Sequence, residues 1–174
     1  MKKIKNFTVS IYIVDHDHVY TSLLKKSIEK PSKYNIETFV TGEKFIAHLA
    51  SQTYRKNDIH IVFLGYYFID DQEHTIMNGI EILEATKVIN PNIEVVMLYT
   101  AEEATYRAYA RNQGAYDFVP KNETAFLRIN NIVMRVISYK KLEQRKRLFA
   151  LSFKLLAAYA ILLGVATLLF VFFN

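Results

Sequence analysis

Short apolar segments alternate along most of the chain with segments whose apolar residues recur at helical spacing. The apolar segments that predict strands are 7–14, 35–40, 59–64, 93–99 and 116–119. The segments that predict helices are 19–30, 41–50 with Thr41 as cap, 79–90, 102–112, and a last one beginning at Glu123. A strand precedes each helix, which predicts a doubly wound α/β fold with a five-stranded parallel sheet and helices on both faces.

The last predicted helix is long, because no proline or glycine interrupts the chain between Glu123 and Gly164. The apolar residues of its first turns share one face: Phe126, Ile129, Ile132, Val133, Val136 and Ile137. This face predicts that the start of the helix packs on the sheet. We expect three parts: a globular domain at 1–139, a basic helical segment at 140–154 and a membrane helix at 155–173.

Residues 155–173 read LLAAYAILLGVATLLFVFF and carry no formal charge. As a helix with about 1.5 Å rise per residue they span roughly 28 Å, close to the ~30 Å hydrocarbon layer of a bilayer. A buried core helix is the alternative, but such helices are usually shorter and keep one polar face. The cations that precede the segment predict a single-pass tail anchor in the inner (cytoplasmic) membrane, with the N-terminal domain in the cytoplasm.

Small residues share one face of the predicted membrane helix at spacings of three and four. They are Ala157, Ala160, Gly164 and Thr167. Small residues let membrane helices approach closely, so this face predicts packing against other transmembrane helices. The alternative is that alanine and glycine are simply frequent in membrane helices.

The chain carries a formal net charge of +5, and many of its cations lie in one stretch. Residues 140–147 read KKLEQRKR, with five cations and one glutamate. A basic stretch beside a membrane helix is attracted to anionic lipid by roughly 1 kcal/mol per cation. We therefore assign the basic balance to lipid and expect no nucleic-acid partner, since the sequence contains no helix-turn-helix. The chain has no cysteine, which excludes disulfides, thiolate metal sites and cysteine nucleophiles.

Four motifs fall on the predicted strands and on one helix between them. They are IYIVDHD at 11–17, IHIVFLGYYF at 59–68, MNGIEILEATKVINPNIEVVMLY at 77–99 and GAYDFVPK at 114–121. Together they resemble the response-regulator receiver domain, a family of flavodoxin-like fold, over about residues 7–139. The resemblance implies a chemistry in which Mg²⁺ at an acid pair helps to move a phosphoryl group onto an aspartate. A lysine and a Ser or Thr then hold the product.

The residues at the family's phosphorylation site match this pattern only in part. Asp15 matches the first acid of the metal-binding pair and Lys121 matches the lysine, but His16 replaces the second acid. An imidazole is a poor ligand for Mg²⁺, which prefers oxygen. The aspartate that accepts the phosphoryl group is replaced by Gly65, which has no side chain to phosphorylate.

Two further family positions follow from the count back from the lysine. The Ser/Thr position is Tyr99 in a gapless alignment, or Thr100 if one residue is inserted, and Phe118 matches the aromatic switch position. We predict that Asp15 pairs with Lys121 in place of metal and phosphate, because an unpaired, partly buried lysine would be costly. We also predict that the Tyr99 ring fills the space left by the missing aspartate side chain.

The segment YYFIDDQEHTIM at 66–77 is longer than usual for the family and mixes aromatic with acidic residues. It is either a solvated loop or an element that binds a partner. Its Asp70 and Asp71 do not replace the acceptor, because neither lies at the strand end. The histidines lie at positions 16, 18, 48, 60 and 74, on predicted elements that do not meet. We therefore expect no metal site.

These features predict a protein without enzymatic activity, cofactor or small-molecule substrate. We interpret the chain as a phosphorylation-independent, membrane-anchored pseudo-receiver that binds protein partners at the cytoplasmic membrane face; its relation to two-component signalling is implied by the resemblance. One alternative is a structural subunit of a multi-protein inner-membrane machine. The others are a decoy that binds a sensor kinase and a receiver phosphorylated at a non-standard site. The sequence leaves the partner open.

Overall fold

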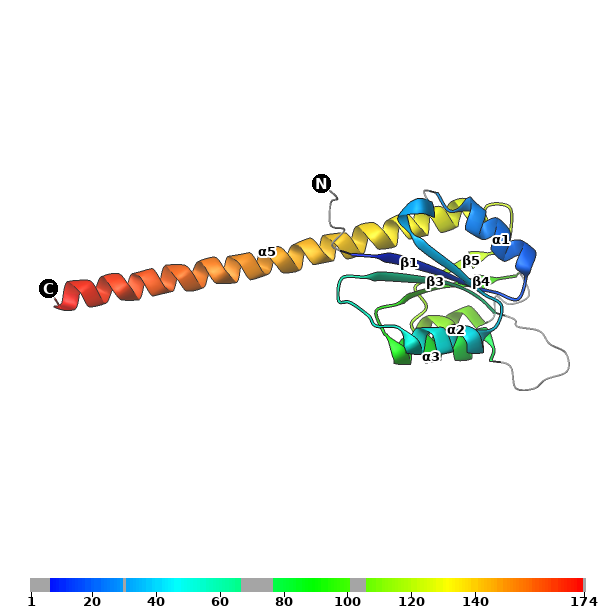
Figure 1. The fold of residues 1–174 in the computed structure, drawn as a ribbon, viewed down its shortest axis with the longest axis horizontal. Coiled ribbons are helices and arrows are strands. Elements are labelled where there is room, and N and C mark those ends of the chain that lie inside the picture. Colours follow the sequence, from blue (N-terminus) through cyan, green and yellow to red (C-terminus); the bar gives the residue numbers. More distant parts are fainter. Residues whose placement is uncertain (1–6, 30, 67–76, 101–105, 174) are drawn as a thin grey trace. The chain divides into compact units, whose positions relative to one another are not determined.

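The chain forms a five-stranded parallel sheet with strand order β2-β1-β3-β4-β5 (Figure 1). The strands are β1 Val9–Val14, β2 Asn35–Phe39, β3 Ile59–Gly65, β4 Glu94–Tyr99 and β5 Asp117–Pro120. The computed structural model describes residues 7–29, 31–66, 77–100 and 106–173; within the last range, the side chains of Leu163 and of residues 165–173 lie outside the description. The predicted five-stranded parallel sheet is confirmed.

Helices cover both faces of the sheet. They are α1 His18–Ser27, α2 Gly42–Ser51, α3 Gly79–Ile89, α4 Arg107–Asn112 and α5 Ala125–Phe173. On one face, Leu24 of α1 and Ile129 and Val133 of α5 join a buried cluster. On the other face, the second buried cluster includes Phe45 of α2 and Leu83 of α3. Each such buried side chain stabilises the fold by roughly 1.5–3 kcal/mol relative to an exposed one.

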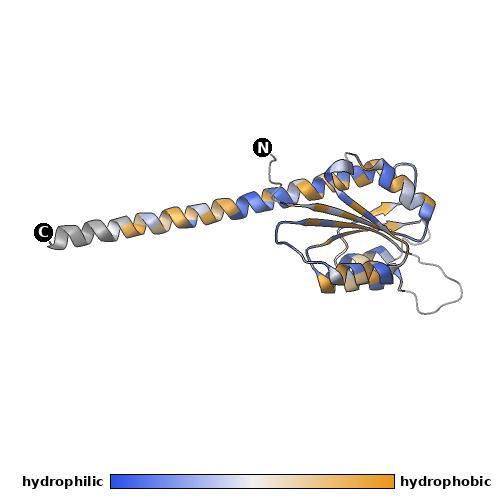
Figure 2. Ribbon diagram, in the orientation of Figure 1, coloured by the Kyte–Doolittle hydropathy of each residue, from blue (hydrophilic) through white to orange (hydrophobic). Residues whose placement is uncertain are grey.

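The central strands are apolar because both of their faces are covered. All six residues of β1 are buried, and β3 is buried at every position except His60. Figure 2 shows much of the sheet in the orange of hydrophobic residues. Continuous apolar runs of this kind are typical of parallel strands between two helical layers.

Side chains at the helix starts satisfy backbone N–H groups that have no partner within the helix. Asp17 Oδ1 accepts bonds from the N–H groups of Val19 and Tyr20, both at 2.9 Å. Thr41 caps α2 as predicted, since its side chain accepts from the N–H of Lys44. Asn78 caps α3 in a reciprocal box with Glu81.

Several predicted boundaries shift by a few residues. The first strand begins at Val9 rather than at residue 7, and α1 ends at Ser27 because Ile28 has extended backbone (φ −67°, ψ 119°). The last helix begins at Ala125 rather than at Glu123. The predicted start of the fourth helix falls on residues 101–105, outside the described residues, and α4 is described from Arg107.

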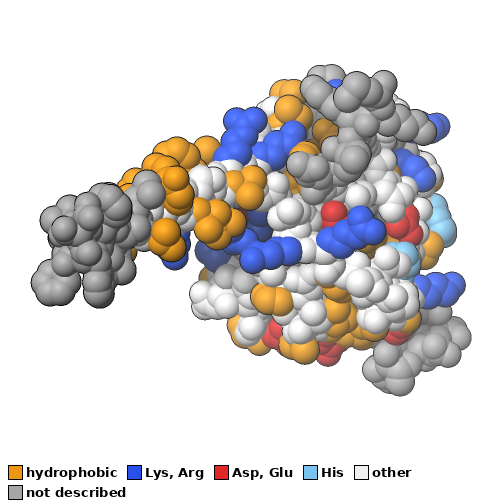
Figure 3. Space-filling view, turned by 60° about the vertical axis from the view of Figure 1, so that its left-hand side comes forward, with side chains coloured by type: hydrophobic (Ala, Val, Ile, Leu, Met, Phe, Trp, Pro, Cys, Tyr) orange, Lys and Arg blue, Asp and Glu red, His pale blue; other side chains and the backbone are white. Residues whose placement is uncertain are grey.

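Residues 138–174 form a second compact unit, separate from the unit at 1–137. Its described side chains are those of α5, where Glu143 and Arg147 form an ion pair one turn apart. Beyond the basic stretch, large apolar side chains such as Phe149, Phe153 and Leu156 are exposed. Figure 3 shows hydrophobic side chains in orange along the surface of this helix. Among the described residues, no helix is long and apolar enough to cross a membrane.

Candidate functional site

The carboxyl ends of the parallel strands meet at one edge of the sheet. Val14 of β1 lies opposite Leu64 of β3, so the next residues, Asp15 and Gly65, are neighbours. The same edge carries the other predicted site residues, which are His16 after β1, Tyr99 and Thr100 at the end of β4, and Lys121 after β5. Ligands of open α/β sheets bind at this edge, which makes it the candidate site.

Asp15 and Lys121 form an ion pair at the centre of this edge. Asp15 Oδ2 lies 2.6 Å from Lys121 Nζ, and the two side chains are 0 % and 17 % exposed. The contact has the distance of an ion pair but not the angles of a directed hydrogen bond. The other carboxylate oxygen, Oδ1, accepts the N–H of Asp17 at 3.0 Å and lies 3.5 Å from His16 Nδ1. The predicted pairing of Asp15 with Lys121 is confirmed.

The carboxylate of Asp15 also fills the space beside Gly65. A Cβ atom added to Gly65 would lie 2.5 Å from Asp15 Oδ2 and 2.9 Å from its Cγ. Our prediction that the Tyr99 ring occupies this space is wrong, because the atoms nearest to that position all belong to Asp15. The same oxygen, Oδ2, lies 2.6 Å from Lys121 Nζ, so one atom of Asp15 makes both the ion pair and the contact beside Gly65.

Tyr20, in the first turn of α1, completes the surroundings of Lys121. The Lys121 Nζ atom lies 5.2 Å from the centre of the Tyr20 ring, within the range of a cation–π interaction. Burial, and then the charges of Asp15 and Asp17, raise the pKa of the Tyr20 hydroxyl to about 12. We did not predict this contact. The signal available in the sequence was the position of Tyr20 three residues after Asp17, the cap of α1.

The pKa of Asp17 is itself lowered, chiefly by the N–H of Tyr20 and also by that of Val19. This carboxylate is therefore used as a helix cap.

Of the described residues at the strand ends, Asp15 is paired with Lys121, His16 offers nitrogen and Gly65 offers only its backbone. Since Mg²⁺ requires several oxygen ligands in near-octahedral geometry, these residues do not fit the metal of the family.

Tyr99 and Phe118 lie beside this centre and face α4. Phe118 is 2 % exposed, whereas Tyr99 is half-buried. The Arg107 guanidinium carbon lies 5.0 Å from the Tyr99 ring centre and 5.4 Å from that of Phe118. Arg111 adds a second guanidinium, 5.4 Å from the Phe118 ring. The predicted switch aromatic is thus buried and covered by two arginines.

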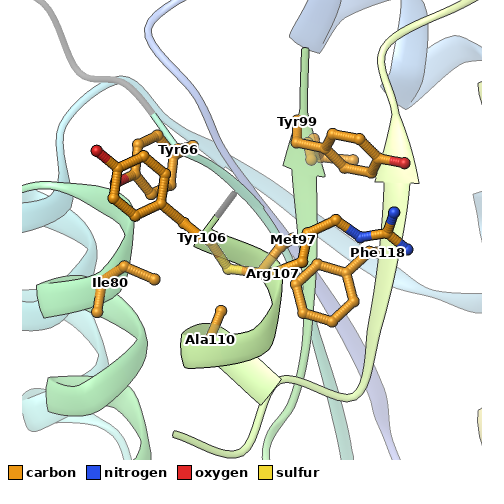
Figure 4. Close-up of a pocket in the computed structure, with 9 residues that line it drawn as sticks. Tyr66, Ile80, Met97, Tyr99, Tyr106, Arg107, Ala110 and Phe118 are labelled. Carbon is orange, nitrogen blue, oxygen red and sulfur yellow. The ribbon is translucent and has the colours of Figure 1, made fainter. Parts of the chain in front are cut away.

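Tyr99 and Phe118 also line a pocket between α3 and α4 that the sequence did not indicate (Figure 4). Its empty volume is about 220 Å³, open solvent included. Tyr66 and Tyr106 form the opposite wall, with their rings stacked at 4.7 Å and 24°. Each of these aromatic residues was visible in the sequence, but their meeting depends on how α3 and α4 pack.

The remaining predicted residues lie apart from this centre or outside the described residues. Thr100 is exposed directly after β4. Asp70, Asp71 and His74 fall within 67–76, outside the described residues. On α5, Ala157, Ala160 and Gly164 are exposed, and the side chain of Thr167 lies outside the description.

His48 and His60 each lie against the ring of Tyr12. The rings of His48 and His60 lie 5.8 Å and 6.1 Å from the ring of Tyr12. The prediction that the five histidines do not converge on one site stays a prediction, since His74 lies outside the described residues. Among the described residues, no group of three or more His, Asp or Glu side chains is placed to hold a metal ion.

Comparisons with known proteins agree with this architecture. The family model of the response regulator receiver domain matches residues 11–131. NtrX from Brucella abortus superposes with a TM-score of 0.63 at 20 % identity, over 78 % of this chain and 28 % of that one. A CheY-like receiver domain protein from Methanospirillum hungatei JF-1 gives 0.64 at 18 % identity, over 78 % and 98 %. No curated protein matches the chain.

The structural neighbours show the fold, and the chain spans just over a quarter of NtrX. The match to the family model covers most of the domain at 1–137 and includes Asp15, Gly65 and Lys121. The chain therefore belongs to the response regulator receiver domain family and is related to two-component signalling.

Proposed function

We propose that this chain is a receiver that works without phosphorylation, as a membrane-anchored interaction or regulatory subunit related to two-component signalling. One observation carries the proposal: the Asp15–Lys121 ion pair lies directly against Gly65. Phosphoryl transfer depends on positioning and on neutralising the charge of the transferring group. Here the lysine is already neutralised, and the acceptor position has neither a side chain nor room for one. Binding through a fixed surface is the activity that remains.

The membrane part of the proposal rests on sequence and exposure. Residues 155–173 carry no charge, and the large apolar side chains described on α5 from Leu148 to Leu162 are exposed. A lipid environment would cover these side chains. The basic stretch at 140–147 would contact anionic headgroups, which supports a receiver domain at the cytoplasmic face.

A second candidate is a structural subunit of a multi-protein membrane assembly. The observation that favours it is the small-residue face of α5, where Ala157, Ala160 and Gly164 leave room for another helix backbone. Replacing these three residues with leucine separates the two candidates. Loss of a stable membrane complex supports the assembly, whereas unchanged complexes support a lone anchor.

The test of phosphorylation uses acetyl phosphate and Mg²⁺ as the donor system. Intact-mass spectrometry of the purified full chain is expected to show no added phosphoryl group, while a receiver with its acceptor aspartate, treated in parallel, gains one. A labile phosphoryl adduct on this chain refutes the proposal. The same experiment tests whether a non-standard residue accepts the group.

The test of anchoring is membrane fractionation of the full chain after an alkaline carbonate wash. We expect the chain to remain in the membrane pellet, and the double variant Leu162→Asp, Gly164→Asp to be released, because charges at the centre of a membrane helix are costly. The variant Val19→Asp, which places a charge on exposed α1, is the control and should stay in the pellet. Release of the wild-type chain by the wash contradicts the anchor.

A further inference from the structure

The C-terminal end of α2 is held on the sheet by aromatic rings. Tyr12 of β1 is 2 % exposed, and its ring centre lies 5.6 Å from that of Phe45 and 5.8 Å from that of His48, both on α2. After the helix, Tyr54 donates its hydroxyl to the carbonyl oxygen of Leu49 at 2.8 Å. The last turn of α2 is therefore held by the ring of Tyr12 and by the hydroxyl of Tyr54.

His60, the second residue of β3, contacts both of these tyrosines. Its ring is stacked on that of Tyr12, with centres 6.1 Å apart and planes at 3°, and the Tyr54 ring meets it edge-on at 5.1 Å. Its Nδ1 atom lies 3.4 Å from the Tyr12 hydroxyl oxygen. Among the described residues, no group forms a hydrogen bond with its buried Nε2 atom. A neutral imidazole can leave Nε2 without a hydrogen, whereas an imidazolium carries a hydrogen on both nitrogens.

The acids nearest to His60 do not supply the acceptor that an imidazolium needs. Burial lowers the pKa of the His60 ring, and the charge of Asp58 raises it by less. One carboxylate oxygen of Asp58 accepts the N–H of Thr8 at 2.8 Å. On the neighbouring strand β4, Glu94 lies opposite Ile61, so its side chain points to the other face of the sheet from His60.

His48, in the last turn of α2, is the second histidine of this group. Its Nε2 atom lies 3.5 Å from Glu37 Oε2 on β2. A proton on His48 would therefore be attracted by Glu37 and would hold the helix on the sheet. The phenols of Tyr12 and Tyr54 stay neutral at acidic pH, because burial raises the pKa of both. His60 is thus the residue of this group whose protonation opposes the packing of α2.

We propose that His60 makes the C-terminal end of α2 sensitive to acid: protonation of its buried ring releases Tyr54 and the last turn of the helix from the sheet. The imidazolium carries a second N–H that needs an acceptor, and water reaches it when the Tyr54 ring moves away. Little other packing is lost, because residues 51–53 and 55–57 are already exposed. The inference does not depend on the proposed function, and it gives the α2 side of the domain a response to pH.

The size of the response follows from the two environments of His60. In the released segment the ring is solvated and has an ordinary pKa of about 6.5. On the sheet the ring stays neutral to lower pH. Lowering the pH from 7.5 to 5.5 therefore increases the population of the released form by up to about tenfold.

Hydrogen–deuterium exchange of the full chain in nanodiscs of zwitterionic lipid, at pH 7.5 and 5.5, measures this release. The exchange is compared as protection factors, which correct for the effect of pH on the intrinsic rate. We expect the protection of residues 46–52 to fall by about threefold to tenfold at pH 5.5. Residues 129–137, which pack on the opposite face of the sheet, should change by less than about twofold.

Variants identify the group that responds. His60→Gln removes the titrating ring and keeps a polar side chain beside Tyr12, and His60→Phe keeps an aromatic ring. In each variant, the protection of residues 46–52 should be the same at both pH values. His18→Gln removes an exposed histidine from α1 and is the matched control, which should keep the full response. Thermal unfolding at pH 7.5 shows that each variant is folded.

Unchanged protection of residues 46–52 in the wild type at pH 5.5 overturns the inference. So does a response that persists in both His60 variants, because another group would then cause it. An equal loss of protection in residues 46–52 and 129–137 also overturns it, since the whole domain would then unfold together. None of these outcomes bears on the proposed function, which fails on a phosphoryl adduct or on release from the membrane.

Discussion

Gly65→Ala is expected to destabilise the domain, because the added methyl group has no room. Its carbon would lie 2.5 Å from Asp15 Oδ2, whereas ordinary contacts of such atoms are 3.4–4 Å. The carboxylate must then move away from Lys121, or the ends of β1 and β3 must separate. The obstacle is steric: the backbone at Gly65 is not in the left-handed region.

The size of the effect follows from the competing terms. Overpacking a buried site costs about 1–3 kcal/mol, and removing one partner of a buried ion pair costs about 3–5 kcal/mol. Lys121 is 17 % exposed and can follow a shifted carboxylate, so the smaller figure applies. Replacing glycine gains back about 0.4–1 kcal/mol through the unfolded chain. We expect a net loss of about 1–2 kcal/mol and a Tm lower by roughly 4–8 °C.

Urea unfolding of the full chain in mild detergent measures this loss, and a double-mutant cycle with Asp15→Ala identifies its cause. Without the carboxylate, the nearest remaining atom of residue 15 is its Cβ, at 3.5 Å from the added methyl group, which is an ordinary contact. Gly65→Ala should therefore cost almost nothing in the Asp15→Ala background. An equal cost in both backgrounds, or no cost in the wild type, refutes the reasoning. Gly164→Ala, with no atom within 4 Å of the added carbon, is the control.

Three further perturbations test the surroundings of the site and of the core. Lys121→Met leaves the Asp15 carboxylate buried without its cation, so the free energy of unfolding should fall by about 3 kcal/mol or more. Lys25→Met, at an exposed position on α1, should change the free energy of unfolding little. Equal effects of the two variants contradict a special role for the Asp15–Lys121 pair. Asn130→Ala removes the bonds that join α5 to the end of α1, to Glu29 N at 2.9 Å and Ser27 O at 2.8 Å. A loss of about 1–3 kcal/mol is expected, and exposed Asn131→Ala is the control. Burial lowers the pKa of His60 below its usual 6.5, so the unfolded chain binds this proton first and stability falls as pH decreases below about 6.5. In the variant His60→Phe, the free energy of unfolding from urea titrations should depend less on pH between about pH 7 and 5. An unchanged pH dependence contradicts this role of His60.

The order of strands and helices was predictable because the spacing of apolar residues along the sequence indicates each element. The Asp15–Lys121 pair was predictable because the topology of the parallel sheet brings the two residues together. In a parallel sheet the strand ends meet at one edge, so residues that follow β1 and β5 become neighbours whatever their side chains do. The alternation of apolar runs with helical segments then fixes which residues those are. Thr41 was predictable for a similar reason, since a cap acts within one turn.

The position of Tyr99 was not predictable in this way. Two groups could fill the space beside Gly65, and the choice depends on the directions of their side chains, which the sequence pattern does not give. The meeting of His48 with Tyr12 likewise depends on how α2 lies across the sheet. The spacing of apolar residues indicates which face of a helix is buried, but it does not indicate which residues that face contacts.

On the proposed function, the glycine at the acceptor position and the ion pair are parts of one arrangement, so restoring one residue is not expected to restore phosphotransfer. An aspartate at position 65 would need the volume that Asp15 Oδ2 occupies, and it would bring a second negative charge against a carboxylate that is 0 % exposed. Lys121 can neutralise one of the two, and His16 gives Mg²⁺ no oxygen with which to neutralise the other. The new carboxylate would then be protonated or displaced, and in neither state can it attack a phosphoryl group in line. On this argument a return to phosphotransfer requires changes at both positions 16 and 65, together with a new position for the Asp15 side chain. The single substitution Gly65→Asp should lower stability without creating an acceptor.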